Sequence, residues 1–215
     1  MNKAVLFDLD GTLIDTIQDI TDAMNKMLVN HGFSPVSADE MKSNLGGSSR
    51  DITRLAIGKE ISESLLDQCL NEYTDNYISG KSPKTCVFPG MEKVIKQLKN
   101  RGYKLFAVSN KPNFEIDAIY ERVLAPLGLD AVIGLSEKVS PKPNPEGTLN
   151  LLKKFDVAIE NAYFVGDGET DVMTALNAKI NCIAVLWGNR NKDFLSKYGA
   201  TVFANTPEEL LSLIK

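Results

Sequence analysis

The chain has 215 residues, of which 43% are hydrophobic and 24% are charged, and its formal net charge is −4. This composition is typical of a soluble globular protein of one domain, or of one domain with a modest insertion, and it excludes a disordered or collagenous chain. The net negative charge offers the phosphate backbone of a nucleic acid no basic surface, so we expect no nucleic-acid partner.

The first apolar run, residues 4–7, stops at Asp8 and is too short and too charged for a signal peptide or a membrane span. The three cysteines, Cys69, Cys86 and Cys182, are far apart, odd in number and without CxxC spacing. We interpret them as reduced thiols rather than as a metal or redox site. We therefore expect a cytoplasmic protein that does not associate with membranes.

The same run, Ala-Val-Leu-Phe, is typical of a strand that is buried on both faces of a parallel sheet. It ends in Asp8-Leu-Asp-Gly-Thr12, in which Gly11 and Thr12 allow a tight turn. The closely spaced carboxylates of Asp8 and Asp10 repel each other unless a cation or a proton intervenes. Three interpretations follow for this segment alone: a divalent-metal site, an acid–base pair or a plain acidic turn.

From about residue 15 to residue 80 the sequence has helical spacing and no convincing strand. Apolar residues recur at helical intervals in Ile17, Ile20, Met24 and Met27. Residues 37–40 form a capping box, and the Gly-Gly-Ser-Ser loop at 46–49 separates two proposed helices. Because this insertion follows the first strand directly, it can fold over the carboxyl end of that strand, where open α/β sheets bind ligands. We predict a helical cap over residues 15–82 and a core domain of residues 1–14 and 83–215.

In the rest of the chain, apolar runs alternate with helical periods. The runs lie at residues 104–108, 131–135, 162–165 and 182–186, with a shorter run at 201–204. The helical periods comprise Met91, Val94, Ile95 and Leu98, then Leu149, Leu152 and Phe155, then Val172, Ala175 and Leu176. Residues 206–209 read as a capping box. The alternation predicts an α/β fold with a doubly wound parallel sheet.

Acidic residues gather at a second strand end, in the sequence Gly-Asp-Gly-Glu-Thr-Asp at 166–171. If both strands are central, Asp8, Asp10, Asp167 and Asp171 share one crevice, which is electrostatically untenable without a hard cation. Oxygen-only ligands suit Mg²⁺, and the acid spacing lacks the twelve-residue pattern of a calcium-binding EF-hand.

Two further strand ends carry Ser109 with Asn110, and Lys142. A hydroxyl, backbone amides and an ammonium group are what a transferring phosphoryl group requires. Each of these residues alone is also common at a solvated surface.

In the predicted cap, Gly46, Gly47 and Arg50 are candidates for substrate contact. A Gly-rich loop can approach a ligand closely, and Arg can bind an anionic group. The alternative is a turn between helices with an exposed Arg.

Taken together, the motifs resemble the haloacid dehalogenase superfamily of aspartyl phosphotransferases, in the family's order and over essentially the whole chain. The turn at residues 88–90 and the sequence Ser-Asn-Lys-Pro at 109–112 are similar to the phosphoglycolate phosphatase branch, whose helical cap follows the first motif. The resemblance implies a catalytic core that acts on small phosphorylated metabolites as a phosphoric monoester hydrolase, with phosphoglycolate as a candidate substrate.

By position, the resemblance implies that Asp8 attacks phosphorus and forms an aspartyl-phosphate. Asp10 is then the acid that protonates the leaving oxygen and the base that activates water. Lys142 neutralises charge shared by Asp8 and the phosphate. Because Asp8 must be ionised while Asp10 carries a proton, the two carboxyl groups need unlike environments.

The resemblance also implies a Mg²⁺ ion held by the carboxylates of Asp8 and Asp167 and by the backbone carbonyl of Asp10, with Asp171 in the outer shell. It implies that Ser109 and Asn110 hold phosphoryl oxygens.

Related activities are distinguished by single positions. Dehalogenases of the superfamily lack the second acid, which is present here as Asp10, and sugar-phosphate mutases resemble one another in a cap histidine where this chain has Ile20. A mutase or phosphotransferase stays an alternative, as does a non-catalytic phosphometabolite-binding regulatory protein, because a fold does not determine activity. We expect a monomer or a small homo-oligomer.

Overall fold

The computed structural model describes residues 2–136 and 139–215, so three residues of the predicted core domain, 1, 137 and 138, lie outside the described residues. Within them, a six-stranded parallel sheet has the order β5-β4-β1-β6-β7-β8. The strands are β1 (Asn2–Phe7), β4 (Tyr103–Pro112), β5 (Ala131–Leu135), β6 (Val157–Gly166), β7 (Asn181–Val185) and β8 (Phe203–Ala204). Each predicted apolar run coincides at least in part with a strand, although the run at 201–204 is strand only at Phe203–Ala204, and the doubly wound α/β fold is confirmed.

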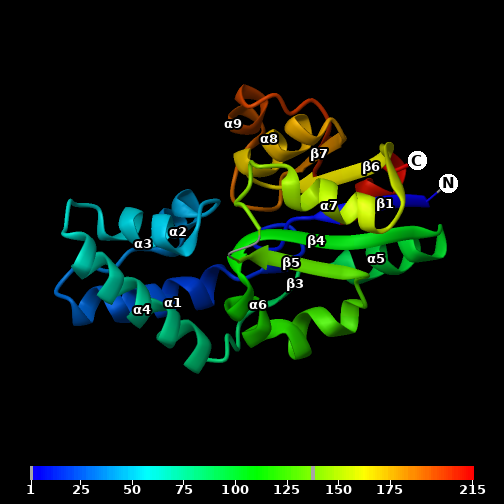
Figure 1. Cartoon of the computed structure of the whole chain (residues 1–215). Coiled ribbons are helices and arrows are strands. Elements are labelled where there is room, and N and C mark those ends of the chain that lie inside the picture. Colours follow the sequence, from blue (N-terminus) through cyan, green and yellow to red (C-terminus); the bar gives the residue numbers. More distant parts are fainter. Residues whose placement is uncertain (1, 137–138) are drawn as a thin grey trace.

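Helices cover both faces of the sheet (Figure 1). Successive side chains of a strand point to opposite faces, so Val5 and Phe7 of β1 pack in one core cluster while Ala4 and Leu6 pack in another. The first cluster includes residues of α5 (Met91–Asn100), α6 (Asn113–Ile119) and α10 (Leu210–Leu213), and the second includes residues of α7 (Glu146–Lys154) and α8 (Glu169–Ala178). Helix α9 (Lys192–Lys197) follows β7, and short π- and 3-10 turns occupy Tyr120–Leu124, Ala125–Leu127 and Pro207–Glu209.

The insertion consists of α1 (Ile17–Asn30), α2 (Ala38–Asn44), α3 (Ser49–Ile57) and α4 (Glu63–Ser79), which lie together beside the sheet in Figure 1. They share a separate apolar cluster that includes the predicted Ile17, Ile20, Met24 and Met27. Two strands that the sequence did not reveal, β2 (Ile14–Asp15) and β3 (Cys86–Val87), pair antiparallel where the chain leaves and re-enters the core. A strand of two residues is too short to show the alternation of apolar and polar side chains by which a strand is predicted from sequence.

The predicted helix caps and buried helix positions were partly confirmed. Ser37 and Glu40 form the predicted capping box at the start of α2. The capping box predicted at 206–209 is not formed: Thr206 makes no side-chain cap, and Glu209 accepts from the backbone N–H of Asn205 at 2.9 Å. The prediction for Leu176 was wrong: it is 51% exposed, since it lies one residue, or about 100°, beyond the buried Ala175 on α8.

The cysteines form no disulfide, in agreement with the prediction of free thiols. None of the helices in the described residues combines the length and hydrophobicity that a membrane span requires.

Candidate active site

The site lies at the carboxyl end of the sheet. Strand β1 is central, and its neighbours β4 and β6 are reached by connections in opposite directions, which is where open α/β sheets form a ligand crevice. A cavity at this point is lined by nine of the predicted site residues: Asp8, Asp10, Gly46, Gly47, Ser109, Asn110, Lys142, Asp167 and Asp171.

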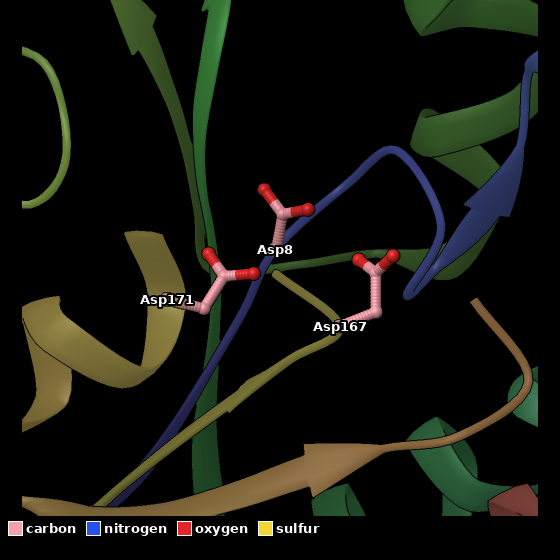
Figure 2. A group of neighbouring side chains, drawn as sticks. All are labelled: Asp8, Asp167 and Asp171. Carbon is pink, nitrogen blue, oxygen red and sulfur yellow. The ribbon is translucent and has the colours of Figure 1, made fainter. Parts of the chain in front are cut away.

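Three buried carboxylates converge in this crevice. Asp8 follows β1, Asp167 follows β6 and Asp171 lies in the first turn of α8, and one oxygen of each lies within 4.8 Å of the others (Figure 2). Burial, and then the nearby charge of Asp171, raises the pKa of Asp8 well above its ordinary value. The same two causes raise the pKa of Asp167 to about 6. The protein alone thus disfavours full ionisation of the cluster.

Lys142 is the cation nearest to these carboxylates. Its Nζ atom lies 2.5 Å from Asp8 Oδ1 and 2.6 Å from Asp171 Oδ1. Burial opposes the charge of this ammonium group, but Asp171 and Asp8 outweigh burial and raise the pKa of Lys142. One ammonium against three carboxylates leaves an excess of negative charge in a buried, oxygen-lined site. That donor set fits a hard divalent cation such as Mg²⁺.

The hydrogen bonds of Asp167 and Asp171 differ. Asp171 uses one oxygen for Lys142 and accepts with the other from the backbone N–H of Gly168 at 2.9 Å. Asp167 accepts from the Thr12 hydroxyl at 3.0 Å and from the Asn189 backbone N–H at 2.7 Å. These bonds fix both carboxylates in orientation and occupy each of their oxygens, but only Asp171 is paired with an ammonium group.

Asp10 has surroundings unlike those of Asp8. Its carboxylate accepts from the Thr16 hydroxyl at 2.6 Å and lies 3.3 Å from the ammonium of Lys111, and its side chain is 17% exposed. It therefore lies at the open side of the crevice, where a proton can be exchanged with a ligand or with water.

Ser109 and Asn110 differ in what they offer a ligand. The Ser109 oxygen accepts from the backbone N–H of Lys111 at 3.1 Å. The Asn110 amide group accepts from the Lys142 backbone N–H at 2.7 Å and donates to the carbonyls of Lys142 and Gly46, each at 3.1 Å. The side chain of Asn110 thus joins the Lys142 loop to the helical insertion at Gly46.

The structure does not bring Arg50 to the cavity. Its guanidinium lies 2.5 Å from Glu63 and 2.5 Å from Asp67, both on α4. The cavity is lined instead by Ser49 and Ile52 of α3, and a step of one residue turns a helical side chain by about 100°. Gly46 and Gly47 do line the cavity, and Gly46 has a φ of +118°, which favours glycine.

Several lining residues were missed from the sequence. The ammonium of Lys111 lies 3.7 Å from Glu115, which also accepts from the Ser49 hydroxyl at 2.7 Å. Burial raises the pKa of Glu115. Lys111 directly follows the Ser-Asn pair at the end of β4, so its position in the sequence could have identified it as a site residue. Glu115 and Ser49 are 66 residues apart and meet only because the helical insertion packs against α6 beside the sheet.

Ile20, which takes the place of the mutase histidine, also lines the cavity, as do Tyr73, Asn189 and Arg190.

Comparison with known proteins identifies the relatives of this fold and site. Residues 5–185 match the family of haloacid dehalogenase-like hydrolases. Phosphoglycolate phosphatase 1 of Pseudomonas aeruginosa is 30% identical, over 97% of this chain and 78% of that enzyme. The phosphoglycolate phosphatase of Psychrobacter arcticus is 29% identical, over 87% of this chain and 85% of that enzyme.

The crystal structure of a candidate phosphoglycolate phosphatase from Lactobacillus delbrueckii superposes with a TM-score of 0.90 at 30% identity, covering 100% of this chain and 99% of that one. Fold, sequence and motif order therefore agree. The chain belongs to the haloacid dehalogenase-like hydrolase family and is a phosphatase of its phosphoglycolate phosphatase-like branch.

Proposed function

We propose that this phosphatase hydrolyses small phosphate monoesters, with phosphoglycolate as the first candidate, through a phosphorylated Asp8 and with Mg²⁺ as cofactor. The observation that carries the proposal is the buried cluster of Asp8, Asp167 and Asp171 around Lys142, with Asp10 beside it. The relatives named as phosphoglycolate phosphatases support the choice of substrate.

The carboxylates of Asp8 and Asp167 and the backbone carbonyl of Asp10 would hold the metal ion, with Asp171 in the outer shell. Asp171 is already paired with the ammonium of Lys142, whereas both donors to Asp167 are neutral, which supports the outer position of Asp171. Bound Mg²⁺ supplies positive charge that keeps Asp8 ionised and offsets charge on the phosphoryl oxygens.

In the first half-reaction, the Asp8 carboxylate forms a bond to phosphorus while the bond from phosphorus to the ester oxygen breaks. Asp10 gives its proton to that leaving oxygen. In the second half-reaction, Asp10 takes a proton from water, the water oxygen bonds to phosphorus and the bond between Asp8 and phosphorus breaks. Thr16 and Lys111 hold the Asp10 carboxylate in place, and Lys111 stabilises the anion between the two steps.

The phosphoryl group would lie between Lys142, the Ser109 hydroxyl and the backbone N–H of Asn110. Its remaining ester portion would face the cap, where Ile20, Ser49 and the Gly46–Gly47 turn line the cavity. We propose residues 15–82 as the specificity cap and residues 1–14 and 83–215 as the catalytic core. We also propose a cytoplasmic monomer or small homo-oligomer, in keeping with the free cysteines.

The test is a substrate panel with phosphoglycolate, sugar phosphates, nucleotides and pyrophosphate, assayed with and without Mg²⁺. We expect metal-dependent turnover that is abolished in Asp8→Asn and retained in the control Asp22→Asn, whose carboxylate pairs with Lys84 on the surface. Turnover by Asp8→Asn at the wild-type rate would refute the mechanism. Phosphoglycolate ranking among the poorest substrates would refute the substrate assignment alone.

A further inference from the structure

A short loop after β7 contacts both the carboxylate cluster and the cap. It comprises residues 187–190, Trp-Gly-Asn-Arg, and we call it the connector loop. It precedes α9 and lies at the carboxyl end of the sheet. No motif in the sequence drew attention to it, although two of its residues, Asn189 and Arg190, line the cavity.

On the core side, the connector loop is fixed against Asp167. The Asn189 backbone N–H donates to Asp167 Oδ2 at 2.7 Å. The Trp187 indole N–H donates at 3.1 Å to the carbonyl of Thr12, whose hydroxyl binds the other oxygen of Asp167 at 3.0 Å. At Gly188, an added Cβ would lie 2.4 Å from Asp167 Cβ, so the backbone has no room to shift towards the carboxylate.

On the cap side, Arg190 binds the end of helix α2. Its NH1 group donates to the carbonyl of Lys42 at 2.7 Å, and its NH2 group donates to the carbonyls of Leu45 at 2.7 Å and Ser43 at 3.2 Å. The last carbonyls of a helix have no partner within the helix and carry its negative dipole end, so a cation is favoured there. The guanidinium of Arg190 thus caps the C-terminus of α2.

The contacts of Arg190 decide against a role in substrate binding. Its Nε atom donates to Glu169 Oε2 at 3.1 Å, so each of the three guanidinium nitrogens already has a protein acceptor. The side chain is 11% exposed, and the guanidinium lies 5.3 Å from the ring centre of Phe194. The guanidinium group is therefore engaged by the cap and by Glu169 and is not available to an anionic ligand.

We propose that Arg190 is a positioning residue that couples docking of α2 to the orientation of Asp167 through the connector loop. Asn189, which binds Asp167, and Arg190, which binds the cap, are adjacent residues, so when Arg190 releases α2, the backbone at Asn189 loses its anchor on the cap side. The inference rests on the proposed metal role of Asp167. It adds that cap docking and Mg²⁺ binding favour each other, and such coupling is reciprocal.

The experiment uses the full chain and Mg²⁺ alone, without substrate. Trp187 is the only tryptophan, so its fluorescence reports Mg²⁺ binding at the connector loop. Amide hydrogen exchange over residues 38–57 reports docking of α2 and α3. We expect Arg190→Gln to weaken Mg²⁺ binding about tenfold, the lower end for partners that orient metal ligands. We also expect it to lose the protection that Mg²⁺ gives residues 38–57.

Arg190→Lys keeps the charge but cannot reach all of the acceptors, and should restore part of both effects. Arg54→Gln is the matched control, because Arg54 pairs with Glu63 on the cap surface, away from the connector loop, and should behave as wild type. At saturating Mg²⁺, the turnover number of Arg190→Gln should recover, which a general packing defect would not permit.

Wild-type Mg²⁺ affinity in Arg190→Gln, or weaker affinity with unchanged exchange over residues 38–57, would overturn the coupling. If Arg190→Gln does not fold, Glu169→Ala removes the acceptor of Nε and should weaken Mg²⁺ binding in the same direction. An unchanged affinity in that variant would likewise overturn it. These readouts need no turnover, so they are distinct from the substrate panel, whose failure would refute the proposed function.

Discussion

Replacing Asp167 by asparagine should stabilise the metal-free protein at pH 7, yet leave it less stable than wild type when Mg²⁺ is present. Without metal, Asp167 is a like charge buried beside Asp171, and removal of that charge relieves repulsion and desolvation. With metal, the same carboxylate is a proposed ligand, and asparagine is a weaker one.

The size of the effect follows from the site. Burial and Asp171 raise the pKa of Asp167 from 3.8 to about 6. At about 1.4 kcal/mol per pKa unit, ionising this group costs the folded metal-free protein about 3 kcal/mol. Asparagine has one acceptor oxygen for the two donors, Thr12 and Asn189, and losing one such bond costs about 1 kcal/mol. The expected net gain is about 2 kcal/mol.

The pH dependence has a definite sign. Below about pH 4 the carboxyl group of Asp167 is protonated in both the folded and the unfolded state, so its ionisation does not destabilise wild type. As the pH rises from about 4 to about 6, the unfolded chain releases its proton first, and the free energy of unfolding of wild type falls. Above that window the penalty is constant. The advantage of Asp167→Asn should therefore be absent near pH 4 and complete at pH 7.

Urea unfolding at pH 4.5 and pH 7, with a chelator or with Mg²⁺, measures these differences. Asp193→Asn, on exposed residue 193 of α9, serves as the control and should show neither shift. The reasoning is refuted if Asp167→Asn is the less stable protein at pH 7 without metal, or if Mg²⁺ stabilises it as much as wild type.

Three further substitutions test other parts of the site. Lys142→Met leaves the carboxylate of Asp8 buried without its cation, so metal-free unfolding should become easier by about 3–5 kcal/mol and turnover should vanish; an unchanged urea midpoint would contradict this. Gly11→Ala places a Cβ 2.4 Å from Asp167 Oδ2 at a φ of +93°, so Mg²⁺ affinity measured by tryptophan fluorescence should fall at least about tenfold, whereas wild-type affinity would show that the turn can move. Arg50→Ala should leave the KM for phosphoglycolate unchanged, because this guanidinium is engaged on the cap surface, and a raised KM would return Arg50 to the substrate site.

The sequence alone determined the sheet and the position of its polar edge. Strand segments buried on both faces are continuously apolar, so residues 4–7 of β1 and 162–165 of β6 were visible as runs, and the polar residues at their ends were conspicuous. Because parallel strands end at one edge, Asp8, Asp167 and Lys142 could be placed together before any contact was known.

Only the tertiary structure decided which cap residues meet the core. Helical periodicity shows that one face of α3 is buried, but not what covers it. We therefore predicted Arg50 as the substrate contact, whereas in the structure Ser49 faces the site and donates to Glu115, and Arg50 pairs with Glu63. Arg190 was overlooked for the same reason: its partners are backbone carbonyls of α2, about 150 residues away, and a carbonyl has no signature in the sequence. Contacts of this kind depend on how two separately packed units dock, and the docking geometry is a property of the folded chain.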